Sequence, residues 1–186
     1  MGAPHNKKRY GETWNAIDLT VMQTEIEKFR DLVVVSGGWA WHFMSPPHIE
    51  LKHAHDHKDA DLFVHPDILW KMMERMESEG YEKTWTRFDG VTENFVRYTK
   101  VAAGERPVKV IFDLFIEEVA SVETPVGIQV VEPETLLSFY GNKHSSVECF
   151  SVAIAKDLLD RGQSPVGHAK MADFTPWVSA AHHGRR

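Results

Sequence analysis

The sequence has 186 residues, a formal net charge of −6, and 42% hydrophobic and 26% charged residues. This length suits one domain with a core of its own, and the composition excludes collagenous, coiled-coil and disordered chains. The acidic balance argues against a long basic surface that follows nucleic acid, and the single cysteine, Cys149, excludes an internal disulfide.

The N-terminal residues and the apolar runs give expectations about location and domain organisation. Residues 1–11 lack the apolar segment of a signal peptide, and no apolar run is long enough to span a membrane. We therefore expect a cytoplasmic protein that contacts no membrane. We predict a flexible tail over residues 1–12, one domain over 13–162, and a partly docked C-terminal tail over 163–186.

Hydrophobic periodicity predicts the elements in chain order. The first half should hold an amphipathic helix from Asp18 to Phe29, a buried strand over 32–35, a glycine turn at 36–38, a helix over 39–44, and a loop with four histidines over 48–58. The rest should hold a strand over 59–65, a helix from Ile68 to Gly80, strands over 81–88, 94–101, 108–116 and 126–131, and helices over 133–140 and 145–159. Residues 102–107 should close a hairpin.

Three acids interrupt strands that are otherwise apolar. Asp59 and Asp61 stand two residues apart, so their side chains point to the same face of a strand with Cα atoms about 6.5–7 Å apart. Two such charges repel each other unless a cation compensates them, and paired carboxylates suit Mg²⁺, which prefers oxygen ligands. Asp113 breaks a second apolar strand. The three acids therefore predict one metal site.

The glycine turn predicts a phosphate contact. Ser36, Gly37 and Gly38 stand between the predicted strand and helix, where glycine lets backbone amides approach an anion at a helix N-terminus. Glycine also serves such turns for conformation alone. Together with the two acids of the next strand, the turn favours a site for a nucleotide and a metal.

These residues resemble the polymerase-beta-like nucleotidyltransferase superfamily, in particular its lincosamide and aminoglycoside nucleotidyltransferase-like branch. That branch carries Gly-Gly-Trp-Ala and then Arg-x-His-x-Asp-Ile-Asp. Gly37 to Ala40 match the first block, and His57, Asp59 and Asp61 match the second, with Asp113 as the third acid. His55 stands where the branch has arginine. The resemblance covers roughly residues 30–162 and includes the segment from Val131 to Lys143, its weakest part.

The resemblance implies an α+β fold, with a mixed twisted β-sheet flanked by helices. It implies transfer of a nucleoside monophosphate from a nucleoside triphosphate to a hydroxyl acceptor, with Mg²⁺ or Mn²⁺ bound by Asp59, Asp61 and Asp113. In such chemistry two ions about 3.5–4 Å apart hold the attacking and leaving oxygens. Ser36, Gly37, Gly38 and Lys143 would contact the nucleotide. The acceptor is not implied, and a small molecule is favoured over long nucleic acid.

Two other functions are compatible with the sequence. The run from His53 to His57 nearly matches the His-x-His-x-Asp-His pattern of zinc hydrolases, in which imidazoles hold a catalytic metal. The other alternative is a non-catalytic nucleotide-binding module of the same fold, which the retention of three acids disfavours. If the protein is a nucleotidyltransferase, we expect residues 48–57 to select the acceptor.

Overall fold

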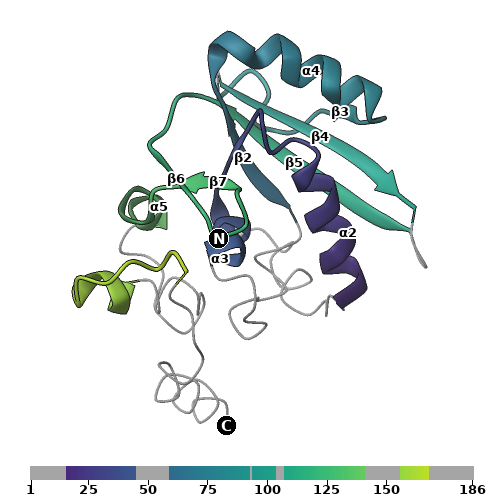
Figure 1. Ribbon diagram of the computed structural model, residues 1–186. Helices are drawn as coiled ribbons and strands as arrows, with labels where there is room; N and C mark the ends of the chain where they lie inside the picture. Colours follow the sequence, from purple (N-terminus) through teal and green to yellow (C-terminus); the bar gives the residue numbers. More distant parts are fainter. Residues whose placement is uncertain (1–15, 45–58, 93, 104–106, 141–155, 168–186) are drawn as a thin grey trace, which may run out of the picture.

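A computed structural model describes residues 16–44, 59–92, 94–103, 107–140 and 156–167 (Figure 1). In this part of the chain seven strands form one sheet in the order β3-β4-β5-β2-β1-β7-β6. The strands are β1 (Val34–Val35), β2 (Ala60–Val64), β3 (Glu82–Thr84), β4 (Phe95–Ala102), β5 (Val108–Ile116), β6 (Ser121–Glu123) and β7 (Gln129–Val131). The helices are α2 (Ala16–Glu27), α3 (Gly37–Met44), the 3₁₀ turn η3 (Pro66–Ile68), α4 (Leu69–Ser78) and α5 (Pro133–Tyr140).

The sheet is mixed, as the sequence predicts. β2 pairs in parallel with β5, and β1 pairs in parallel with β7. The pairs β1–β2, β3–β4, β4–β5 and β6–β7 are antiparallel. The expectation of a mixed sheet flanked by helices is therefore confirmed.

The two faces of the sheet have different coverings. On one face Phe112 of β5 contacts Phe29, which follows α2, and Tyr81, which follows α4, with ring centroids 5.6 Å and 4.9 Å away. On the other face Phe63 of β2 stacks against Phe139 of α5. Because side chains alternate along a strand, Asp61 shares the α5 face with Phe63, whereas Leu62 points into the main core.

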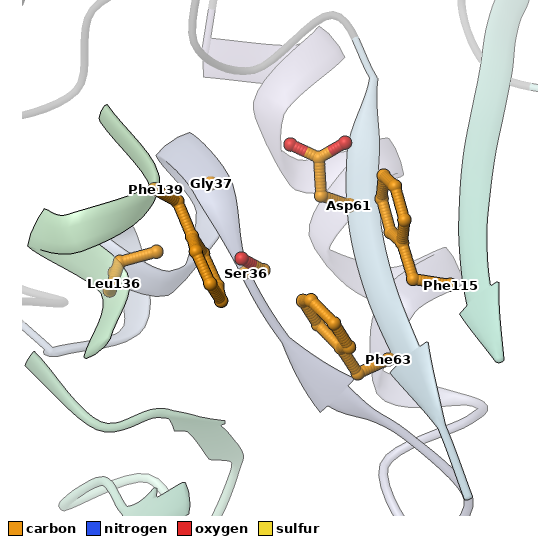
Figure 2. Close-up of a pocket in the computed structure, with 7 residues that line it drawn as sticks. All are labelled: Ser36, Gly37, Asp61, Phe63, Phe115, Leu136 and Phe139. Carbon is orange, nitrogen blue, oxygen red and sulfur yellow. The ribbon is translucent and has the colours of Figure 1, made fainter. Parts of the chain in front are cut away.

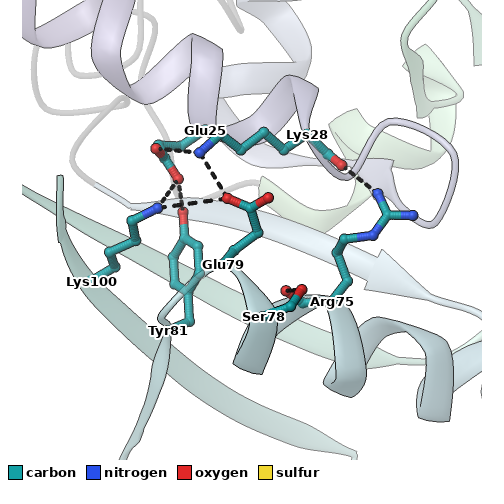
Figure 3. Close-up of polar contacts among 7 residues, drawn as sticks. All are labelled: Glu25, Lys28, Arg75, Ser78, Glu79, Tyr81 and Lys100. Carbon is teal, nitrogen blue, oxygen red and sulfur yellow. Dashed lines mark hydrogen bonds and ion pairs between the residues drawn. The ribbon is translucent and has the colours of Figure 1, made fainter.

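A polar network joins α2 to α4, Tyr81 and β4 (Figure 3). The buried carboxylate of Glu25 accepts hydrogen bonds from Lys28 and Lys100, each at 2.9 Å, and from the hydroxyl of Tyr81 at 2.8 Å. Lys28 also binds Glu79 at 2.8 Å. These contacts hold α2 against the sheet, because the buried carboxylate of Glu25 would lose its charged partner on β4 if α2 moved.

Several element boundaries differ from the predictions. β5 has the predicted bounds. The strand predicted over 81–88 is only Glu82–Thr84, because a hydrogen-bonded turn over 86–89 follows it. The strand predicted over 126–131 begins at Gln129, because Thr124 and Gly127 form a turn before it. The strand predicted over 32–35 is reduced to Val34–Val35. The sequence analysis missed β6.

The C-terminal part of the described chain touches the domain. Residues 156–160 are helical, Val166 packs against the core, and the amide of Gly167 donates to the carbonyl of Met44 at 2.9 Å. The predicted N-terminal tail and residues 168–186 lie outside the described residues.

Among the residues that are described, no helix is both long enough and apolar enough to cross a membrane.

Candidate functional site

The structure brings the three predicted acids together on two adjacent strands of the sheet. Asp61 of β2 and Asp113 of β5 are direct partners in the parallel register, and Asp59 immediately precedes β2. Asp59, Asp61 and Asp113 therefore share the face that α5 covers. Asp113 is 7% exposed, while Asp59 and Asp61 are half-buried. Three carboxylates on this face concentrate negative charge at the boundary between core and solvent.

Arg97 of β4 neutralises part of that charge. Its Nε and Nη2 donate to the two oxygens of Asp113, both at 2.6 Å, in a bidentate ion pair. Its Nη2 also lies 3.7 Å from Oδ2 of Asp59. The hydrogen bonds to Asp113 raise the pKa of Arg97 against the opposing effect of burial, and the charges of Asp113, Asp59 and Asp61 raise it further. Arg97 therefore stays charged and is bound to the acids from the β4 side.

The glycine turn lies on the opposite side of Asp61. Gly37 begins α3 with a φ of +59°, a conformation that residues other than glycine rarely adopt. A Cβ atom at Gly37 would overlap the Asp61 carboxylate. Ser36 is buried, and its amide donates to the carbonyl of Asp61 at 2.8 Å. The glycine thus allows a helix N-terminus, where partial positive charge gathers, to lie directly against an acid.

A pocket of about 410 Å³ adjoins the turn and Asp61. In Figure 2 the side chains of Phe63 and Phe115 lie along the strands, those of Leu136 and Phe139 reach in from α5, and Ser36 lies between the two groups. The rings of Phe63 and Phe139 are stacked, with centroids 5.8 Å apart. One wall of the pocket is therefore aromatic and another is the predicted phosphate turn.

The other predicted site residues have different outcomes. Gly38 is the second residue of α3 and is half-buried. Lys143 and the histidine-rich run over 48–57 lie outside the described residues.

The sequence analysis missed Arg97 and the phenylalanines of the pocket. A signal for Arg97 was present, because a hairpin that pairs Ala102 with Val108 must also pair Arg97 with Asp113. Phe63 and Phe115 each stand two residues after an acid, so they share its face of the sheet. Phe139 had no comparable signal, since its contact with Phe63 depends on how α5 packs.

The donor chemistry of the three acids fits a divalent cation such as Mg²⁺, which takes oxygen ligands. Within the described residues, no group of three or more carboxylate, imidazole or thiol side chains is arranged as a metal centre. Both oxygens of Asp113 accept hydrogen bonds from the guanidinium of Arg97. Asp59, Asp61 and Asp113 are the residues that would hold such a cation.

Comparison with known proteins adds no assignment: no protein-family model matches the chain, and no curated protein matches it.

Proposed function

We propose that this protein is a metal-dependent nucleotidyltransferase, which moves a nucleoside monophosphate from a nucleoside triphosphate to a hydroxyl group of an acceptor. One observation carries the proposal: Asp61 lies between Asp113, its partner on β5, and Gly37, whose missing side chain leaves room for the Asp61 carboxylate. A cluster of acids and a glycine turn at a helix N-terminus are the two parts that a site for a metal-bound triphosphate needs.

The reaction assigns a task to each group. The acceptor oxygen attacks the α-phosphorus, the bond to pyrophosphate breaks, and the acceptor proton leaves to a base. Asp59, Asp61 and Asp113 would hold the divalent ions, whose chemistry is to neutralise the triphosphate and stabilise the charge that develops on its oxygens. The amides at the start of α3 would bind a phosphate group, with Gly37 giving close approach.

The residue chemistry favours transfer over the alternatives. Asp59, Asp61 and Asp113 lie on one face of the sheet and offer oxygen ligands of the kind that Mg²⁺ prefers. This donor set favours a metal-dependent transferase over a metal-free binding module. The zinc-hydrolase alternative depends on histidines that the structure does not describe.

A transfer assay tests the proposal. The full chain is incubated with a triphosphate labelled at the α-phosphate, Mg²⁺ and a panel of small hydroxyl compounds, and both labelled products and pyrophosphate are measured. We expect equal amounts of labelled adduct and pyrophosphate, both abolished by a chelator. Release of labelled monophosphate alone would instead indicate a hydrolase.

A further inference from the structure

The pocket beside Asp61 is lined by residues of two chemical kinds. Phe63, Phe115, Leu136 and Phe139 are apolar, whereas Ser36, Gly37 and Asp61 are polar, and Ser36 lies between Phe63 and the side chains of α5 (Figure 2). A ligand that fills this pocket would place an apolar group and a phosphate or metal-binding group within one small volume. The volume of about 410 Å³ is in the range of pockets that take small molecules and cofactors.

The aromatic wall of the pocket is suited to a flat ring. Phe63 is nearly parallel to both of its neighbours, at 22° to Phe139 and 27° to Phe115, with centroids 5.8 Å and 5.3 Å away. Phe139 is 53% exposed, so stacking within the protein leaves much of its surface uncovered. A planar ligand ring that lies against these phenyl rings would gain both stacking and burial.

We infer that the aromatic wall of the pocket, formed by Phe63, Phe115 and Phe139, binds the nucleobase of the triphosphate. The inference rests on the proposed function and extends it, because it assigns the base to these three residues. A nucleotide joins a flat base to a phosphate chain in one molecule, which matches a pocket lined by both aromatic and polar residues. The aromatic wall is hydrocarbon, so affinity should follow the stacking area and favour purines over pyrimidines.

The position of the glycine turn favours the base over the acceptor as the occupant. Ser36 and Gly37, at the turn where the triphosphate would bind, line the same pocket as the phenylalanines, and the base is covalently joined to that triphosphate.

The experiment compares ATP with ribose 5′-triphosphate, which has the same phosphates but no base. Both are titrated calorimetrically in Mg²⁺ into the full wild-type chain, Phe139→Ala and Phe88→Ala. Phe88 is 42% exposed and belongs to the β3–β4 connection, so it serves as a matched control. Melting temperatures verify that each variant is folded.

The expected result is specific to the base. Wild type and Phe88→Ala should bind ATP more tightly than ribose 5′-triphosphate, and Phe139→Ala should weaken ATP about tenfold while leaving ribose 5′-triphosphate unchanged.

Three results would overturn the inference. Unchanged ATP binding by Phe139→Ala, or an equal loss for both ligands, would show that the base binds elsewhere and would leave the proposed function standing. If wild type bound neither ligand, the proposed function would fail and the inference with it.

Discussion

Arg97 and Asp113 face each other across β4 and β5 and share two hydrogen bonds of 2.6 Å. The same guanidinium lies 3.7 Å from Asp59, so one arginine touches two of the three acids. Arg97 therefore has the position of a counterion that a bound metal would partly replace. This relationship makes the charge of the site accessible to experiment before an acceptor is known.

We predict that Arg97→Met makes the stability of the fold depend on Mg²⁺. Breaking a fully buried ion pair costs about 3–5 kcal/mol, and the partial exposure of Arg97 reduces the expected loss to about 2 kcal/mol. Millimolar Mg²⁺ should recover much of the lost stability, because a cation bound to Asp113 would compensate its negative charge in place of the guanidinium. Thermal unfolding with and without Mg²⁺ measures it.

The control for Arg97→Met is Arg75→Met. Arg75 also makes local contacts, to the carbonyl of Lys28 at 2.9 Å and to Asp31 at 3.5 Å, but it lies away from the acids. The stability that Arg75→Met loses should be the same with and without Mg²⁺. If Mg²⁺ stabilised Arg97→Met no more than wild type, Arg97 would be an ordinary structural partner of Asp113.

Asp61→Asn should abolish transfer and leave the fold intact. The amide keeps the shape of the side chain beside Gly37 but lacks the charge that binds a cation. We expect turnover to fall by a factor of about 10²–10³, the usual cost of removing one group that stabilises transition-state charge. Rate measurements beside a melting curve separate the two effects, and near-normal turnover would remove Asp61 from the site.

Gly37→Ala should damage both stability and triphosphate binding. Alanine is disfavoured at a φ of +59°, and its Cβ would displace the Asp61 carboxylate. Gly90→Ala is the matched control, because Gly90 has a φ of +82° with open space around it. Backbone strain should lower the free energy of unfolding of both variants by about 1 kcal/mol. Only Gly37→Ala should lose triphosphate affinity, and equal affinities in the two variants would mean that Gly37 only shapes the turn.

Glu25→Gln should make the free energy of unfolding depend less on pH in the acid range. Burial would raise the pKa of Glu25, but hydrogen bonds from Lys100, Lys28 and Tyr81 lower it below its ordinary value of 4.5. The charged carboxylate therefore stabilises the folded state above about pH 4.5, and this contribution is lost as the pH falls through the lower folded-state pKa.

At neutral pH the free energy of unfolding of Glu25→Gln should be about 2 kcal/mol lower than that of wild type. Chemical denaturation from about pH 7 to about pH 3 measures both effects. Glu82→Gln, at an exposed position on β3, should follow the wild-type profile. A Glu25→Gln profile as steep as that of wild type would assign the acid sensitivity to other carboxylates.

The elements with strong patterns could be predicted from the sequence. The largely apolar run of β5, interrupted at Lys109 and Asp113, predicted its bounds, and the Asp59–Asp61 spacing predicted a shared face. β6 is only Ser121–Glu123, with exposed residues at both ends, and exists because it pairs with β7. Local pattern carries no information about such a strand, since its partner supplies its hydrogen bonds.

The site was predictable where one strand or turn supplies it and not where several elements meet. The shared face of Asp59 and Asp61 and the glycine turn follow from residue type and spacing alone, whereas the position of Asp113 beside Asp61 depends on the pairing of β2 with β5. The bidentate pair between Arg97 and Asp113 depends on the register of a hairpin, and the pocket depends on α5 bringing Phe139 to Phe63. Both relationships join residues distant in the chain, which single-strand periodicity does not report.

The most direct test of the central claim is calorimetric titration of the full chain with a triphosphate that cannot be cleaved at the α-phosphate. We predict saturable binding of one nucleotide per chain in Mg²⁺, with the affinity lost both in a chelator and in Asp61→Asn. Equal affinity with Mg²⁺ and with the chelator would contradict a metal-dependent nucleotidyltransferase site at Asp59, Asp61 and Asp113.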